Sequence, residues 1–317
     1  MKAIRVDEFG EPDVMRLVEM AEPEPGPDQV LIRIGAAGVN PVDTYIRAGK
    51  YAAKPTLPFT PGKDGAGTIE HDGAGFKAGE RVFVCVPVTG TYAEMCTCTA
   101  MNVYRLPDKI SFEQGAALGV PYGTAHRALF ERGQARSGET LLVHGATGGV
   151  GTAAVQLAKA AGLKVFGTGG TDKGRVLVRQ NGANEVFDHR DANYQEQIMA
   201  ATNGRGVDLI LEMLANVNLA RDLKMLAPGG RVVVVGSRGP IEIDPRDTMQ
   251  RDADIRGMML GHGSQEKRTK MYNEIADGLA KGSLNPVIGK KYKLSEAPQA
   301  HQAVMEAGAF GKIVLIP

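Results

Sequence analysis

The chain has 317 residues, of which 37 are basic and 36 acidic, so its formal net charge is +1. This length predicts two domains of ordinary size. The charge balance argues against a dedicated nucleic-acid or membrane-surface protein, because such proteins gain affinity from a large basic excess. Tryptophan is absent and glycine is abundant, at 41 residues. Glycine clusters mark places where backbone turns sharply or comes close to a ligand.

Three cysteines, Cys85, Cys96 and Cys98, form neither an even disulfide framework nor a cysteine-rich zinc lobe, which favours a reducing compartment. The N-terminal stretch carries charges throughout and lacks the apolar core of a signal peptide. No window approaches the roughly 18 uncharged apolar residues of a membrane span. We therefore expect a cytoplasmic protein.

From residue 1 to 122 the apolar segments are short, rich in β-branched residues and separated by Gly, Pro and Asp. Several alternate with period two, as at Val30, Ile32 and Ile34. This pattern is typical of a β-rich domain, with strands expected at 2–6, 29–39, 65–71, 80–88, 92–100 and 103–107.

From residue 123 to 257 strands alternate with helices, which predicts βαβ units and a doubly wound parallel sheet of α/β class. Five mostly apolar strands are expected, at 141–144, 164–168, 185–188, 207–213 and 231–236. The helices between them are expected at 150–161, 175–180, 193–202 and 218–226.

The last stretch holds a candidate helix at 266–280 and a closing strand at 312–316. It is too small to fold alone, so we expect it to return to the first domain. The predicted domains are 1–122 completed by 258–317, and 123–257.

The segment LLVHGATGGVG, residues 141–151, is the most informative glycine cluster. A strand, a glycine-rich turn and a helix in this order place free backbone N–H groups and a positive helix end at one point, where a pyrophosphate binds. Gly148 and Gly151 occupy the second and third glycine places of the dinucleotide fingerprint, with Ala146 at the first. Within a run of strand–helix units this pattern predicts nucleotide binding.

The end of the second strand of this domain distinguishes NAD from NADP. An acidic side chain there would accept hydrogen bonds from the ribose 2′-hydroxyl, but the sequence has Gly169, Gly170 and Thr171, followed by Lys173 and Arg175. A hydroxyl and cations favour a 2′-phosphate, because each charge-assisted hydrogen bond contributes roughly 1.5–3 kcal/mol. We expect NADP(H). Asp172 is interpreted as a candidate helix N-cap, and a solvated helix start is the alternative for the two cations.

Seven motifs extend the argument to the whole chain. They resemble the zeta-crystallin-like quinone oxidoreductases of the medium-chain dehydrogenase/reductase superfamily. The runs are GVNPVDTYIRAG, LPFTPGKDGAG, QGAALGVPYGTAHRAL, VHGATGGVG, QNGANEVFDHR, EMLANVNLARDL and GGRVVVVGSRGPIEIDPRDTM. The resemblance implies a GroES-like β-rich catalytic domain, a Rossmann domain, NADPH as reductant and a small-molecule quinone substrate. It also implies a homodimer or homotetramer.

The same superfamily contains zinc alcohol dehydrogenases, which place a cysteine after a Gly-Val pair and a His-Glu pair before a glycine. Here Gly38-Val39 is followed by Asn40, and the second place reads Lys63-Asp64. Cys96 and Cys98 alternate in a predicted strand, so both sulfurs face one side, as in a packed core. Because zinc needs at least three good ligands, the sequence predicts no metal site.

The resemblance also implies individual cofactor contacts. Some of them lie in the glycine-rich turn, which the residues already indicate, and the candidate 2′-phosphate contacts Thr171 and Lys173 are added to them. His189 and Val235–Arg238 follow predicted strands at the carboxyl edge of the sheet, where ligands collect. The full set is Tyr45, Thr147, Gly148, Gly149, Val150, Gly170, Thr171, Lys173, His189, Asn218, Val235, Gly236, Ser237, Arg238, Met258, Met259 and Leu260.

Asn40, Asp43, Tyr45 and Tyr51 are the candidates for substrate positioning, and donation through water is the other role open to Asn40 and Asp43. The alternatives are a packing role for the two tyrosines and a helix-capping role for Asp43. No residue identifies itself as a general acid. Reduction makes a quinone aromatic, so positioning against the nicotinamide is expected to be sufficient, without metal, whether a hydride or an electron is delivered.

Two other functions remain open at the level of the sequence. One is reduction of an activated alkene, such as an enone or an enoyl thioester, with the same cofactor geometry. The other is a structural crystallin role or binding of AU-rich RNA, which the resemblance suggests. The balanced charge and the absence of a basic stretch interleaved with aromatics give RNA binding little support.

Overall fold

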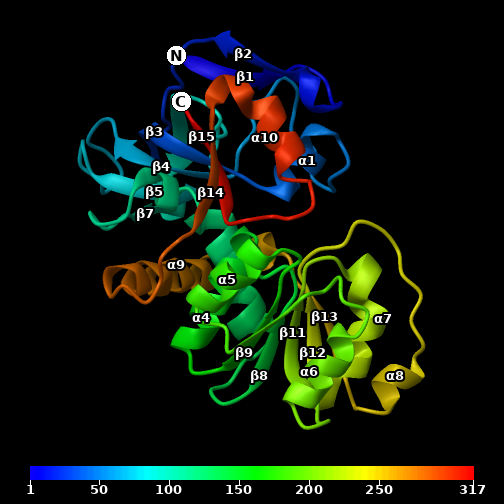
Figure 1. Ribbon diagram of the computed structural model, residues 1–317. Helices are drawn as coiled ribbons and strands as arrows, with labels where there is room; N and C mark the ends of the chain where they lie inside the picture. The colour runs from blue at the N-terminus through cyan, green and yellow to red at the C-terminus, as the bar shows by residue number, and fades with distance from the viewer. The chain divides into compact units, whose positions relative to one another are not determined.

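The computed structural model describes all residues, 1–317. They form two compact units (Figure 1). The first comprises Met1–Pro121 and Ser264–Pro317, and the second comprises Tyr122–Gly263. No helix is long and apolar enough to span a membrane.

The first unit is β-rich and contains most of the short strands expected from the sequence. Its strands are β1 (Lys2–Val6), β2 (Met15–Glu19), β3 (Gln29–Val39), β4 (Asp64–Ile69), β5 (Arg81–Cys85), β6 (Met95–Thr99), β7 (Val103–Arg105), β14 (Ile288–Lys293) and β15 (Lys312–Ile316). Its helices are α1 (Pro41–Arg47), α2 (Phe112–Gly115), α9 (Gln265–Ala280) and α10 (Ala297–Ala303), with single 3₁₀ turns at Pro12–Val14, Ala100–Asn102 and Leu294–Glu296.

Strand β3 organises the main sheet of this unit. It pairs antiparallel with β4, β6 and β15, and the strand order is β14-β15-β3-β4-β5-β7. Ile32 and Ile34 are buried on either side of the exposed Arg33, as alternation predicts for a sheet face over a core. Cys96 and Cys98 are free thiols buried in the same hydrophobic cluster, which confirms their packing role.

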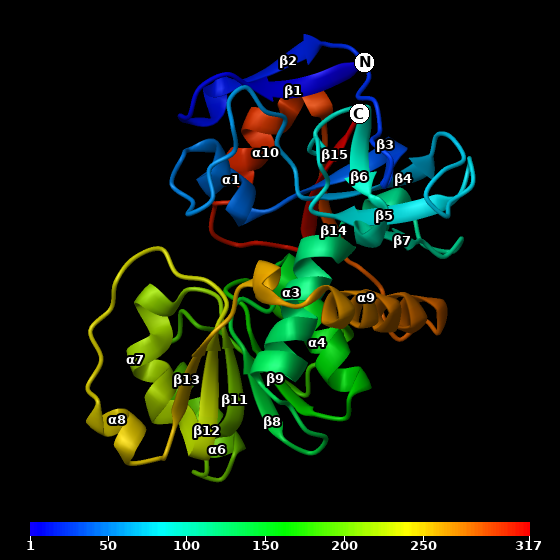
Figure 2. The ribbon, with the colours of Figure 1, turned by 180° about the vertical axis from the view of Figure 1, so that it is seen from behind.

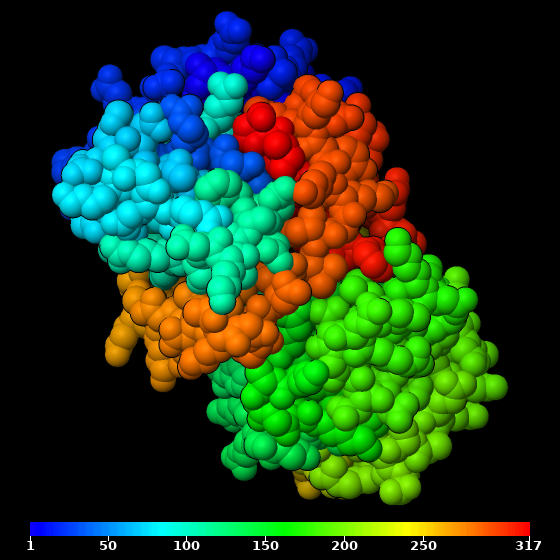
Figure 3. Space-filling view, turned by 60° about the vertical axis from the view of Figure 1, so that its left-hand side comes forward, coloured from blue at the N-terminus to red at the C-terminus, as the bar shows by residue number.

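The C-terminal segment belongs to this first unit. Strand β15 lies between β3 and β14, although β3 and β15 come from opposite ends of the sequence. Figures 1 and 2 show both chain ends in this unit. In Figure 3 the red and orange residues of the last segment share its surface with blue and cyan residues of the first.

The second unit is a Rossmann domain. Its strands are β8 (Thr140–Val143), β9 (Lys164–Thr168), β10 (Glu185–Phe187), β11 (Val207–Glu212), β12 (Leu226–Val234) and β13 (Asp254–Gly257). Its helices are α3 (Gly123–His126), α4 (Gly149–Ala160), α5 (Asp172–Gln180), α6 (Tyr194–Ala201), α7 (Ala215–Met225) and α8 (Arg246–Met249), with a π-helical turn at Arg127–Arg132 and a 3₁₀ turn at Leu260–His262. Another π-helical turn, Leu118–Tyr122, begins in the first unit and ends at the first residue of the second.

All six strands of this unit are parallel, in the order β10-β9-β8-β11-β12-β13. The order reverses direction between β8 and β11, so the carboxyl ends of these strands flank the point where a doubly wound sheet binds its ligand. The predicted α/β class, with a β-rich domain and a parallel doubly wound sheet, is confirmed.

The prediction of five strands in the second unit was wrong, because β13 is a sixth. Its sequence DIRG is short, polar and largely exposed, as befits the edge of a sheet, and lacks the apolar run of an interior strand. Strands β2 (MRLVE) and β14 (IGKKYK) escaped prediction for the same reason. The second unit extends to Gly263, six residues beyond the predicted domain end.

Candidate cofactor and substrate sites

The glycine-rich turn joins β8 to α4. Gly145 adopts φ of +57°, a conformation that favours glycine, and Gly148 is the N-cap of α4. A Cβ on Gly151 would lie 2.3 Å from the carbonyl oxygen of Gly145, so only glycine lets the helix pack against the turn. The turn therefore presents the start of a twelve-residue helix with its N–H groups, which fits a pyrophosphate.

The second strand–helix turn lies directly beside the first. A Cβ on Gly169 would lie 3.1 Å from the methyl group of Thr147, so the two turns are in close contact. The Thr171 hydroxyl accepts a hydrogen bond from the Gly174 N–H at 3.1 Å. Thr171 is thus the N-cap of α5, and the interpretation of Asp172 as the cap was wrong. Its hydroxyl hydrogen remains able to donate to a ligand.

The two cations after this turn differ in their surroundings. Arg175 Nη1 donates to Asp188 Oδ2 at 2.6 Å and to the Gly169 carbonyl at 3.3 Å, and Nη2 donates to Asp172. Its side chain is only 18% exposed. Lys173 lies exposed on the first turn of α5. Arg175 therefore ties the second turn to the end of β10, whereas Lys173 is exposed to solvent.

His189 faces the same turn from the end of β10. Its Nε2 lies 3.0 Å from the position that a Cβ on Gly170 would occupy, so glycine at 170 makes room for the imidazole. Burial lowers the pKa of His189. Arg190 Nη2 lies 3.1 Å from Asp188 Oδ2. Arg190 and Arg175 together hold the pKa of the Asp188 carboxyl well below its usual range. This edge therefore carries an imidazole of lowered pKa next to a carboxylate that pairs with both Arg175 and Arg190.

The remaining candidate cofactor residues of this unit, Asn218, Val235–Arg238 and Met258–Leu260, follow β11, β12 and β13 at the same edge of the sheet. A Cβ on Gly236 would lie 2.5 Å from the Met213 carbonyl oxygen, and the Arg238 N–H donates to Asn216 Oδ1 at 2.8 Å. The Met258 N–H donates to Val234 O at 3.1 Å. Fixed loops thus surround the carboxyl ends of these strands.

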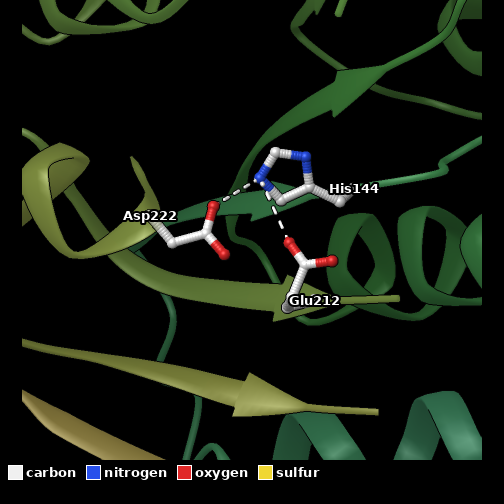
Figure 4. Close-up of side chains that lie close together, drawn as sticks. All are labelled: His144, Glu212 and Asp222. Atoms are coloured by element: carbon white, nitrogen blue, oxygen red, sulfur yellow. Dashed lines mark hydrogen bonds and ion pairs between the residues drawn. The ribbon is translucent and has the colours of Figure 1, made fainter. Parts of the chain in front are cut away.

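A buried cluster beneath this edge, which the sequence analysis missed, consists of His144, Glu212 and Asp222 (Figure 4). His144 Nε2 lies 2.8 Å from Asp222 Oδ1 and 3.6 Å from Glu212 Oε2. Burial alone would lower the pKa of His144, but the two carboxylates outweigh it and raise the pKa to about 9. The imidazolium is therefore the stable form. A histidine and a glutamate ending two apolar strands were the available signal.

Glu212 connects this cluster to the candidate cofactor residues. Its Oε1 accepts hydrogen bonds from the Leu214 N–H and, at 3.2 Å, from Asn218 Nδ2. Burial raises the pKa of Glu212. One ring nitrogen of His144 and one carboxylate oxygen each of Glu212 and Asp222 lie within 4.8 Å of one another, close enough to bind a metal ion. The ion pair between His144 and Asp222 already explains this spacing. The cluster fixes the start of α7 and orients Asn218.

In the first unit a pocket of about 640 Å³ lies beside α1. Its volume is in the range of small-molecule sites. Tyr51 is half-buried in its wall, and the buried Asp43 is part of the same wall. Tyr45 is half-buried on α1 and is not part of the wall. The wall also contains apolar side chains, Ile46, Phe59 and Val88 among them, and the cation Lys63.

Asp43, in this wall, and Asn40, which is not part of it, belong to a buried polar network. The Asn40 N–H donates to Asp43 Oδ2 at 2.9 Å, so Asp43 caps the start of α1 as the alternative interpretation has it. Asn40 Nδ2 donates to Asp64 Oδ2 at 2.9 Å, and Lys312 Nζ donates to Asn40 Oδ1 and, at 2.9 Å, to Asp64 Oδ2. Side chains from two distant segments of the sequence, Asp64 and Lys312, therefore fix Asn40.

The residues of this network do not fit a zinc ion. It offers an amide, two carboxylates and the ammonium of Lys312, which already donates to Asn40 and Asp64. None of these four residues is a cysteine or a histidine, the usual zinc ligands, and an ammonium group repels a metal cation.

Sequence reasoning missed the roles of Asp64, Lys312, Tyr92 and His301. Tyr92 Oη lies 3.4 Å from Asp43 Oδ2 and 3.0 Å from His301 Nε2. Lys312 stands in an otherwise apolar closing strand and is only 3% exposed. A lysine in such a strand was a signal for a buried partner, but its partner could be identified only from the fold.

Comparisons with known proteins agree with this geometry. A model described as "Alcohol dehydrogenase GroES-like domain" matches residues 26–108, and one described as "Zinc-binding dehydrogenase" matches residues 149–277. The quinone oxidoreductase of Rattus norvegicus is 51% identical over 100% of this chain and 98% of its own length, and the one from Homo sapiens is 50% identical over the same shares.

A solved structure agrees as well. The quinone oxidoreductase from Thermus thermophilus, which was also solved in complex with NADPH, is 32% identical and superposes with a TM-score of 0.87 over 100% of both chains. Full-length identity of about half with the rat and human proteins, together with the shared fold, establishes the family. The chain belongs to the quinone oxidoreductase family of the medium-chain dehydrogenase/reductase superfamily.

Proposed function

We propose that this protein reduces quinones with NADPH and uses no metal in doing so. The observation that carries the proposal is the glycine-rich turn of Gly148–Gly151, which fits a dinucleotide pyrophosphate, in a chain half identical over its full length to proteins named quinone oxidoreductase. The complex of the Thermus protein with NADPH supports the choice of cofactor.

The cofactor would be held by three groups of residues and by Tyr45. Thr147–Val150 receive the pyrophosphate at the start of α4, and Gly170, Thr171, Lys173 and His189 receive the adenosine end. Asn218, Val235–Arg238 and Met258–Leu260 line the carboxyl edge beyond it, and Tyr45 contributes from α1. NADPH, when bound, supplies two electrons and one proton as a hydride equivalent.

The substrate would lie in the pocket beside α1. Tyr51 and Asp43 are part of its wall, and Asn40 holds Asp43 in place. Tyr45 is the fourth positioning residue that we propose. Positioning contributes because fixing two reactants in a productive geometry removes much of the entropic cost of their meeting.

The direct experiment is NADPH oxidation by the purified protein, with ortho- and para-quinones as acceptors, NADH as the cofactor control and an enone as the substrate control. We expect turnover with a quinone and a preference for NADPH. Failure with every quinone would refute the proposal. A faster reaction with the enone than with any quinone would make activated alkenes the proposed substrate class.

We further propose the domain division 1–122 with 258–317 and 123–257, and assembly into a homodimer or homotetramer, which sedimentation would test. Three free, buried cysteines support a reducing compartment such as the cytoplasm.

A further inference from the structure

We propose that Asp43 is the general acid of this protein and that its Oδ1 delivers a proton to a quinone oxygen. The inference rests on the proposed quinone reduction and deepens it. It depends on four observations in the first unit: the pocket, the hydrogen bonds of the carboxyl group, its unpartnered oxygen and the side chains behind it.

The two carboxyl oxygens of Asp43 have different surroundings. Oδ2 lies 2.9 Å from the Asn40 backbone nitrogen, 3.3 Å from Asn40 Nδ2 and 3.4 Å from Tyr92 Oη. Oδ1 is buried and has no hydrogen-bond partner, although the residue is part of the pocket wall. A buried oxygen without a partner is costly, so Oδ1 is the oxygen left for a proton or a ligand.

The side chains behind Asp43 determine which oxygen holds the proton. Arg47 Nη1 lies 3.4 Å from His301 Nδ1, and because arginine only donates, Nδ1 must accept. Burial, with the charge of Arg47, lowers the pKa of His301 to about 3, so this ring is neutral and carries its hydrogen on Nε2. It donates to Tyr92 Oη at 3.0 Å.

Tyr92, whose oxygen accepts from His301, directs its own hydrogen to Asp43 Oδ2. Three donors therefore point at Oδ2, which leaves no direction for an additional proton there. A protonated Asp43 must carry its hydrogen on Oδ1, the side on which it has no protein partner.

The charges around Asp43 suit this task. Burial and the nearby Asp64 raise the pKa of Asp43. This rise is opposed by Lys312, by the Asn40 N–H and by Lys63, and the resulting pKa is about 6. A general acid works best when its pKa lies near the operating pH. The remaining groups in the network, Tyr92, His301 and Arg47, are neutral or permanently charged near neutrality.

Reduction of a quinone to a hydroquinone takes two electrons and two protons, and NADPH supplies both electrons and one proton as a hydride equivalent. The O–H bond of Asp43 breaks as a new O–H bond forms on the quinone oxygen, directly or through one water molecule. Asp43 is left as a carboxylate, which takes its next proton from solvent through the pocket.

Asp43→Asn is the matched test, because its amide oxygen can accept the same donors while its NH₂ group replaces the acid. The pH profile of kcat/KM for a quinone should fall above about pH 6 in the unsubstituted protein. In the variant we expect a rate at least about 100-fold lower at pH 5.5 and a flat profile. Asp108→Asn, at a side chain that is 97% exposed, is the control and should keep the original profile.

Tyr92→Phe is the second variant, in case Asp43→Asn does not fold. It removes one donor from the charged form of Asp43, so the descending limb of the profile should move to higher pH. Infrared difference spectra without cofactor give a readout independent of turnover. A protonated-carboxyl band titrating near pH 6 should be present in the unsubstituted protein and missing from Asp43→Asn.

An Asp43→Asn enzyme with the original rate and pH profile would overturn the assignment of the acid and leave quinone reduction intact. A descending limb that does not move in Tyr92→Phe would do the same. If the unsubstituted protein reduces no quinone at any pH, the proposed function fails and this inference fails with it.

Discussion

Each unit buries a cluster of charged side chains, and the two clusters differ in what they leave open. In the second unit, His144 lies between two carboxylates, and none of the three residues is part of the wall of the 640 Å³ pocket. In the first, Lys312 pairs with Asp64, while the neighbouring Asp43 keeps one oxygen unpartnered in a pocket wall. Buried charged side chains therefore stabilise the fold in the second unit, and in the first unit, as we propose, they also take part in the reaction.

The largest loss of stability is expected from Lys312→Met, which tests the support role of the charged cluster in the first unit. It leaves Asp64 and Asn40 buried without their cation, and removing one partner of a buried ion pair costs about 3–5 kcal/mol. Urea unfolding should show this loss in the first unit. Lys290→Met, at an exposed lysine of β14, is the control and should change stability little. Equal stability of the two variants would mean that the Lys312 pair contributes nothing.

The stability that the cluster of His144, Glu212 and Asp222 provides should depend on pH, and the change should be almost as large. The pKa of His144 is raised from 6.5 to about 9, which corresponds to roughly 3 kcal/mol at about 1.4 kcal/mol per unit. Because the folded state binds this proton more tightly, the stabilisation is complete below pH 6.5 and is lost as the pH rises through 9. The raised pKa of Glu212 acts in the same direction.

Melting temperatures between about pH 6 and pH 9.5 would measure this loss. Asp222→Asn removes the charge that raises the pKa of His144, so its curve should be lower and flatter over the same range. A variant curve parallel to the original would show that His144 does not carry the dependence.

A smaller effect should separate Lys173 from Arg175 in the cofactor site. Lys173→Ala should weaken NADPH binding about tenfold or more, since a charge-assisted contact to phosphate is worth roughly 1.5–3 kcal/mol, and leave NADH binding unchanged. Fluorescence titration of both cofactors measures this. Arg175→Ala should instead lower stability, because this side chain bonds Asp188 and Gly169. Equal loss of both cofactors in Lys173→Ala would refute the assignment.

The smallest expected effect is at Thr171. Thr171→Ala removes the N-cap of α5 and should cost about 1 kcal/mol, whereas Thr171→Ser keeps the hydroxyl and should cost less. Chemical denaturation of the two variants side by side gives the difference. If serine and alanine are equally destabilising, the cap does not stabilise the turn.

The sequence predicts the second unit well because its signals are local. The Gly148–Gly151 turn, its flanking strand and its helix are adjacent in the chain, so spacing alone defines the site. The network around Asp43 could not be predicted in this way. It joins Asn40, Asp64, Tyr92, His301 and Lys312, whose proximity depends on the pairing of β15 with β3 and of β3 with β4.

The polar edge strands were missed for a different reason. Strands β13 and β14 have few apolar residues to reveal a period, and each gains its place from backbone pairing with a buried neighbour. A strand whose order comes from its partner carries little of that order in its own sequence.

The return of the last segment to the first unit has a consequence for synthesis. Tyr122–Gly263 is continuous, so this unit can complete its fold while the ribosome still holds the remaining residues. The first unit cannot close its sheet until β15 has been made, because β15 lies between β3 and β14. The unit that begins translation first therefore finishes folding last, and until then the edge of β3 is open to other chains.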